Sequence, residues 1–84
     1  MLEVGKKYTT RKNGPYECIN IIGNAAYLIS GAGATAYVWD ASNGKAKSLD
    51  EGWDIVHTAI DMMYNALITG EGVAEAIKAY EATV

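Results

Sequence analysis

Cysteine, histidine and proline occur once each in this chain of 84 residues, and phenylalanine does not occur. The single cysteine, Cys18, excludes a disulfide within the chain and is typical of a reducing compartment. With one histidine, His57, the chain has too few of the ligands from which zinc clusters are commonly built. We therefore predict no metal site and no cofactor.

Long apolar runs are also missing. No run approaches the roughly 20 apolar residues that a helix needs to span a bilayer. The N-terminal segment MLEVGKKYTTRK lacks the apolar stretch of a signal peptide. We expect a soluble, cytoplasmic protein with no membrane partner. A chain of this length buries roughly 60–65% of the surface that it exposes when unfolded, so a second subunit would add needed stability.

Basic and acidic residues divide between the two halves of the chain. Residues 1–48 carry six basic and three acidic residues, residues 49–84 carry seven acids and one lysine, and the net charge is −3. Such a division suits contact between subunits, or two faces that meet different partners. It is equally compatible with helices that carboxylates simply keep solvated.

The first half of the chain has the short apolar segments and turn residues of an antiparallel β structure. Asn43-Gly44, between two such segments, strongly predicts a hairpin. The turn residues of segment 12–15 and the pair Gly23-Asn24 predict two earlier turns. The predicted strands are 6–11, 16–22, 25–30, 35–40 and a short one around 45–48.

From Asp50 onwards the apolar residues recur every three or four positions, which predicts helices. One stripe of the first helix contains Val56, Ile60, Met63, Tyr64, Leu67 and Ile68. The glycines of segment 69–72 end this helix, and a second, shorter one carries Val73, Ile77, Tyr80 and Val84 on one face. Helices this short are marginal alone, so both should pack on the sheet or on another subunit.

Two segments together resemble the small proteins of tailed bacteriophages and prophages that form an SH3-like barrel. The residues that carry the resemblance are Gly5, Lys6, Tyr8, Thr10, Arg11 and Gly14 in the first segment, and Asn43, Gly44, Trp53, Asp54, Ile55 and Val56 in the second. The resemblance covers about the first two thirds of the chain and implies a bacterial host cell.

Because most members of that family have no known activity, the resemblance assigns no functional residue. It implies that 53–56 is a last barrel strand and that the helix begins near Thr58, a residue type that often caps helices. The helical tail departs from the commoner pattern, in which the chain stops near the last strand. We therefore expect a specific function or an oligomer interface to lie in the tail.

These observations predict one α+β domain that spans residues 1–84. Residues 1–57 are expected to form a small bent antiparallel sheet or SH3-like barrel of five or six strands. Two short C-terminal helices are expected in residues 58–84.

Catalysis has two candidate sites, and both have simpler explanations. Asp54, His57 and Asp61 would share one face of a continuous helix and could act as a general base or hold a metal. The alternative is a solvated helix face with a weak ion pair. Cys18 could be a nucleophile, but in the middle of an apolar strand it is better explained as a buried, inert thiol. We predict that the protein is not an enzyme.

Nucleic-acid binding is one alternative function. A barrel face could combine stacking tyrosines (Tyr8, Tyr16 or Tyr37) with the cations of the first half. The set proposed for this role is Lys6, Lys7, Tyr8, Arg11 and Lys12, with Lys45 and Lys47 as further cations. Six dispersed cations make a weak field, however, and the acidic tail partly cancels it.

Binding of a small ligand, such as a nucleotide, is another alternative. The glycine-rich loop between Gly31 and Ala34 could form a pocket at a subunit interface. The loop leads into a strand rather than a helix, so an ordinary hairpin connection explains it better than a phosphate-binding loop.

The acidic helical tail suggests the leading hypothesis, in which a host or phage protein is the partner. Exposed tyrosines and carboxylates of the tail are the expected contact residues: Tyr64, Glu71, Glu75, Tyr80 and Glu81. The apolar stripe of the first helix also suits a homodimer through Ile60, Met63 and Leu67. The predicted function is a non-catalytic phage or prophage protein that modulates a macromolecule, such as a host defence or transcription enzyme.

Overall fold

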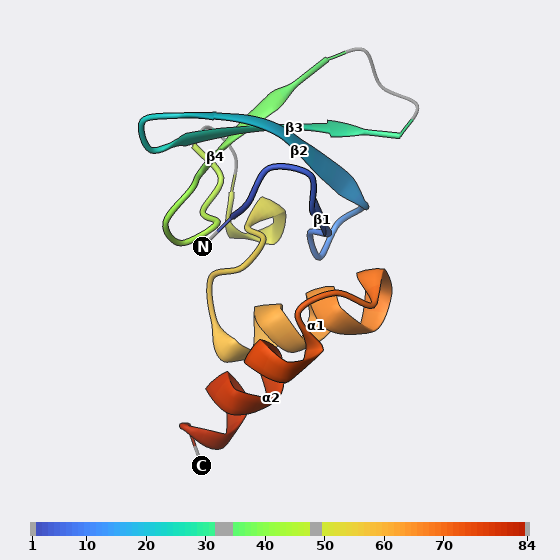
Figure 1. The fold of residues 1–84 in the computed structure, drawn as a ribbon, viewed down its shortest axis with the longest axis vertical. Coiled ribbons are helices and arrows are strands. Elements are labelled where there is room, and N and C mark those ends of the chain that lie inside the picture. The colour runs from blue at the N-terminus through green and yellow to red at the C-terminus, as the bar shows by residue number, and fades with distance from the viewer. Residues whose placement is uncertain (1, 32–34, 48–49, 84) are drawn as a thin grey trace.

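A computed structural model describes residues 2–31, 35–47 and 50–83 and has an α+β layout (Figure 1). Its strands form one four-stranded antiparallel sheet in the order β1-β2-β3-β4, so each strand pairs with its neighbour in the sequence. The elements are β1 (Lys7–Tyr8), β2 (Tyr16–Ile22), β3 (Ala25–Ser30), β4 (Tyr37–Asp40), the 3₁₀ turn η1 (Glu51–Trp53), α1 (Ala59–Thr69) and α2 (Val73–Glu81).

The two central strands, β2 and β3, have the predicted bounds, but the outer strands are shorter than predicted. β1 stops at Tyr8 because Thr10 turns the chain. The Thr10 backbone N–H and hydroxyl both donate to the Asn13 carbonyl, each at 2.8 Å. Thr9 and Thr10 have strong β propensity, and this local turn overrides it.

The strands predicted at 45–48 and 53–56 do not form in the described residues. Segment 45–47 contributes a single bridge, between Ala46 and Trp39. Two backbone bonds accompany this bridge, from the Asp40 N–H to the Lys45 carbonyl at 2.8 Å and from the Lys47 N–H to the Val38 carbonyl at 3.3 Å. On the other side of this segment, the Ala46 N–H donates to the Asp54 carboxylate at 2.8 Å. The pairing ends within the described residues after one bridge, so the described sheet has four strands.

A bulge in β2 changes which residues face the core. Simple alternation would place Cys18, Asn20 and Ile22 on one face, but the register with β3 shifts between Cys18 and Asn20. After the bulge Ile21 packs against the core, and Ile22 is exposed. The alternation prediction is therefore wrong beyond Cys18, because one extra residue reverses the two faces of a strand.

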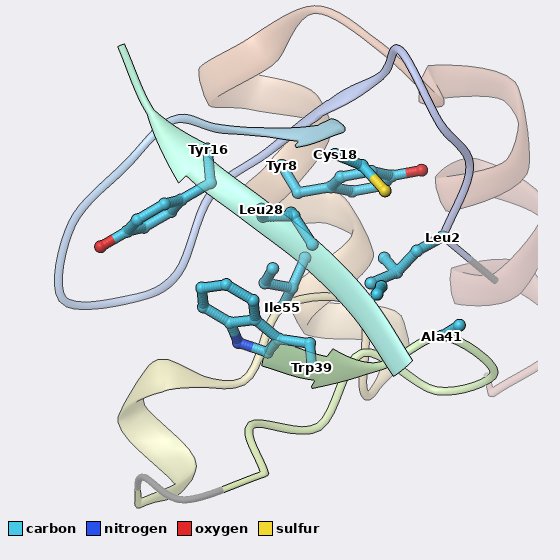
Figure 2. Packing of buried hydrophobic residues seen from close by; sticks show 9 residues of the cluster. Leu2, Tyr8, Tyr16, Cys18, Leu28, Trp39, Ala41 and Ile55 are labelled. Carbon is cyan, nitrogen blue, oxygen red and sulfur yellow. The ribbon is translucent and has the colours of Figure 1, made fainter. Parts of the chain in front are cut away.

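The main hydrophobic cluster lies within the first 57 residues (Figure 2), while Ala66 and Ala76 are buried in the helices. Trp39 is its largest fully buried side chain and packs near Leu28 and Ile55. The cluster consists of Leu2, Tyr8, Tyr16, Cys18, Ala26, Leu28, Trp39, Ala41 and Ile55. Because neither α1 nor α2 contributes to it, other contacts must position the helices.

The helix boundaries agree with the predicted capping residues. The Thr58 hydroxyl accepts a hydrogen bond from the Asp61 backbone N–H at 3.1 Å, as an N-cap does. Gly70 ends α1 with a φ of 74°, a conformation that glycine adopts without strain. α1 and α2 then form a helical hairpin, residues 59–81.

The helical hairpin lies beyond the sheet rather than across one of its faces. Figure 1 shows the sheet at one end of the long axis and the helices at the other. The molecule measures 39 × 23 × 22 Å along its principal axes, and α1 meets the sheet at β1. Neither described helix has the length and apolar character that crossing a membrane requires.

Candidate functional site

The helical hairpin contacts the outer edge of β1 through polar groups. The Asn65 side-chain carbonyl accepts a hydrogen bond from the Thr9 N–H at 2.7 Å, and the Glu71 carboxylate accepts one from the Lys7 N–H at 3.1 Å. Buried Asp61 forms an ion pair with Arg11. These contacts satisfy backbone donors that an open sheet edge would otherwise present to solvent.

The α1 side chains that contact the edge of β1 are therefore polar, and several large apolar residues of α1 are exposed. Leu67 is 78% exposed and Ile60 is 66% exposed, whereas Asp61 and Asn65 are buried. α2 adds exposed apolar residues at intervals of four and three. We call the whole set the apolar stripe: Ile60, Tyr64, Leu67, Ile68, Val73, Ile77 and Tyr80. Large apolar side chains exposed in this number on a small protein commonly mark an interaction site.

The predicted partner-binding residues all lie on the helical hairpin or its connecting loop. Tyr64 and Tyr80 belong to the apolar stripe, and Glu75 and Glu81 are exposed. Glu71 differs because its carboxylate bonds to β1, which makes it a residue that positions the hairpin.

Two of the three residues predicted to form a homodimer are exposed. Ile60 and Leu67 lie in the apolar stripe, but Met63 is half-buried. Ile68 belongs to the first-helix stripe that is predicted to suit a homodimer, whereas no binding role is predicted for Val73 or Ile77. The helical spacing predicts packing on the sheet or on another subunit, and all three residues are exposed in the structure.

The cations predicted to bind nucleic acid are mostly paired with carboxylates. Lys6 lies 2.8 Å from Glu3, and Lys12 lies 3.4 Å from Asp50. The hydrogen bond between Lys6 and Glu3 raises the pKa of the lysine and lowers the pKa of the glutamate. The carboxylate beside each of these cations partly cancels the attraction that the cation would exert on a phosphate.

Two further members of that set are also engaged. Arg11 pairs with Asp61, while Lys7 is exposed. Tyr8 lies in the core, and its hydroxyl accepts the Glu3 N–H at 2.9 Å. The prediction that Tyr8 stacks on a base is therefore wrong, because its ring is buried.

The catalytic arrangement considered for Asp54, His57 and Asp61 does not form. α1 begins at Ala59, so the three residues do not share a helix face. Asp54 is buried and accepts the Ala46 N–H, Asp61 pairs with Arg11, and His57 is exposed. The described residues contain no group of three or more metal-binding side chains.

Cys18 is buried, as its place in an apolar strand predicted. Its side chain is fully inaccessible, and burial raises the pKa of the thiol. The proposed ligand loop between Gly31 and Ala34 is described only at Gly31, so residues 32–34 lie outside the described structure.

We expect native Cys18 to react with a disulfide reagent such as DTNB at least about 1000-fold more slowly than in urea, because reaction needs an opening of the core. Since the folded pKa is raised, the stability that the neutral thiol contributes is complete below the unfolded pKa of about 8.5 and is lost as pH rises. Absorbance gives the labelling rates, and urea unfolding at several pH values gives the stability. Fast labelling of the native protein would contradict the buried position.

Comparison of the chain with family models, curated proteins and solved structures finds no match in any of the three.

Proposed function

We propose that this chain is a non-catalytic interaction protein that binds a partner protein through the apolar stripe of its helical hairpin. The observation that carries the proposal is the orientation of α1, which buries Asp61 and Asn65 and exposes Ile60 and Leu67. A helix normally buries its apolar face. The reverse arrangement exposes the residues whose burial would stabilise a complex.

The composition of the stripe suits a protein partner. Tyr64 and Tyr80 lie in it, at 39% and 49% exposure, and tyrosine is among the residue types that contribute most binding energy at interfaces. The aliphatic residues around the tyrosines would exclude water from the contact.

Charge favours a partner of different sequence over a second copy. The exposed carboxylates of Glu75 and Glu81 lie on α2, and Lys78 is the only basic residue of the helical hairpin. A second copy would bring the same carboxylates to the interface, and like charges oppose association. The partner should therefore present an apolar surface with basic residues around it.

The phage or prophage origin, and modulation of a host defence or transcription enzyme, belong to the same proposal. They are supported by the resemblance of the first two thirds of the chain to small phage proteins. The helical tail that follows also supports them, because it is acidic and exposes apolar residues. The proposal includes the SH3-like barrel that the same resemblance implies for the first two thirds of the chain.

A matched pair of variants tests the proposal. Leu67→Glu introduces a charge into the apolar stripe, and Ile22→Glu introduces the same charge at a residue of similar exposure, 62%, on the sheet. Each tagged protein captures partners from bacterial lysate with and without nuclease, and affinity for the purified partner is then measured by calorimetry. We expect Leu67→Glu to weaken binding at least about 30-fold, because residues central to interfaces cost about 2 kcal/mol or more. Ile22→Glu should leave it unchanged.

Several results would contradict the proposal. Equal affinities for the two variants would place the binding surface elsewhere, and loss of the partner with nuclease would favour nucleic acid. Light scattering should give the monomer mass of 9.0 kDa. A dimer that Leu67→Glu dissociates would instead make a second copy the occupant of the stripe.

A further inference from the structure

Four aromatic rings line a cavity on the sheet, away from the helical hairpin. Tyr16 comes from β2, Tyr37 and Trp39 come from β4, and Trp53 ends η1. Together with Asn13 they enclose about 250 Å³. Both tryptophans of the chain therefore line one cavity.

The rings pack edge to face or tilted against one another and do not form a flat platform. The Tyr16 and Tyr37 rings stand at 83° with centroids 6.5 Å apart, and the Tyr37 and Trp39 rings stand at 70° with the same separation. Tyr16 and Trp39 are in closer contact, at 5.2 Å. Since Tyr16 and Trp39 are buried and Tyr37 is 47% exposed, Tyr37 projects from a fixed aromatic floor.

A second cavity of about 480 Å³ adjoins the first. Asn13, Tyr16 and Tyr37 line both cavities, so the two form one groove that Tyr37 divides. We call this the aromatic groove. The second compartment is completed by Gly14, Pro15, Ser30 and Gly31. Two adjoining compartments suit an extended ligand better than a single small ring.

Internal hydrogen bonds fix the floor of the groove. The Tyr16 hydroxyl donates to the Asn13 side-chain carbonyl at 2.7 Å, and the Trp39 indole N–H donates to the Trp53 backbone carbonyl at 2.7 Å. Three donors remain without a protein acceptor among residues 2–31, 35–47 and 50–83: the Asn13 amide N–H groups, the Trp53 indole N–H and the Tyr37 hydroxyl. The groove therefore offers a ligand the exposed Tyr37 ring, the part of the Trp53 ring that Lys12 does not cover, and residues with unpaired donor groups.

This combination matches a chain of proline residues. Proline has no backbone N–H, so in the polyproline II conformation such a segment offers only carbonyl acceptors and flat apolar rings. The conformation is formed before binding. Its repeat of three residues per turn places prolines on one side of the segment, where they can enter the two compartments in succession. We propose that the aromatic groove binds a proline-rich segment of a partner protein in the polyproline II conformation.

Charge at the groove argues against phosphate-bearing ligands. One cation, Lys12, lies beside the groove, with its ammonium 5.8 Å from the centre of the Trp53 ring and 3.4 Å from the Asp50 carboxylate. A cation that is already paired gives little attraction to a nucleic-acid backbone. The same ammonium occupies the Trp53 face that an organic cation would need.

The test uses the full chain with defined peptides. Because both tryptophans line the aromatic groove, their fluorescence reports directly on its occupancy. The probes are decaproline and a decapeptide library with fixed prolines at two positions three residues apart, and matched peptides with alanine for proline are the controls. We expect a saturable fluorescence change with the proline peptides alone.

Three substitutions locate the binding. Tyr37→Ala removes the ring that divides the aromatic groove and should weaken binding at least tenfold, whereas Tyr37→Phe should weaken it less than threefold. Tyr64→Ala, at a similarly exposed tyrosine of the apolar stripe, should leave peptide affinity unchanged, which separates this proposal from the proposed function. No response to any proline peptide, equal affinity for the alanine peptides, stronger binding of oligothymidine, or full affinity in Tyr37→Ala would overturn it.

Discussion

Replacing Gly44 with alanine should destabilise the protein by about 2–5 kcal/mol. The residue has a φ of +75°, which costs a non-glycine residue roughly 1–2 kcal/mol. In addition, a Cβ at Gly44 would lie 2.4 Å from the Val56 backbone nitrogen and 3.1 Å from its Cα. Backbone cannot rotate away as a side chain can, so this overlap adds roughly 1–3 kcal/mol.

Gly23→Ala is the matched control for this prediction. Gly23 also has a positive φ, +61°, but a Cβ there would meet nothing within 4 Å. It should cost only about 1–2 kcal/mol, the penalty of the left-handed backbone. Urea unfolding followed by fluorescence gives both values. Equal losses in the two variants would show that the Val56 segment moves aside at little cost.

Glycine at position 44 has a second reason beyond the one that the sequence suggested. Asn43-Gly44 predicts a hairpin turn, and the chain does turn there and pair with the end of β4, since the Asp40 N–H donates to the Lys45 carbonyl at 2.8 Å. Gly44 also lies close to the Val56 backbone, a contact that the turn signal does not predict. The Gly44 carbonyl accepts the Ile55 N–H, which joins the loop to the segment that leads into α1.

Local patterns predicted the parts of the fold that depend on neighbouring residues. The bounds of β2 and β3, the Thr58 cap and the end of α1 at Gly70 agree with short apolar runs and capping residues. Segment 53–56, predicted as a last strand, instead holds the loop after β4 through Asp54, which bonds to Ala46 from eight residues away. Contacts of this kind leave no periodicity in the sequence.

The direction of α1 could not be predicted for a related reason. Periodicity shows that two faces of a helix differ, and the usual inference is that the apolar face is buried. Here Asn65 and Asp61 face β1 because Thr9 and Arg11 are available to bond with them. Those partners are 56 and 50 residues away in the sequence, so spacing along α1 contains no information about them.

Replacing Asn65 with alanine should release the helical hairpin while the sheet stays folded. The substitution leaves the buried Thr9 N–H without its acceptor, which typically costs about 1–3 kcal/mol. Because no residue of the helical hairpin belongs to the core cluster, few other contacts resist its separation from β1. Hydrogen exchange should therefore show a roughly 10- to 100-fold loss of protection in α1, and little change in β3.

Asn20→Ala is the control, because Asn20 is exposed on β2 and its side chain bonds to the neighbouring Ile21 N–H. It should change protection in α1 by less than threefold. If Asn65→Ala lowered protection equally in α1 and β3, the helical hairpin and the sheet would unfold as one cooperative unit. Unchanged protection in both would mean that the polar edge contacts do not hold the hairpin. Selective loss would show that Asn65 holds the helical hairpin in the orientation that exposes the apolar stripe.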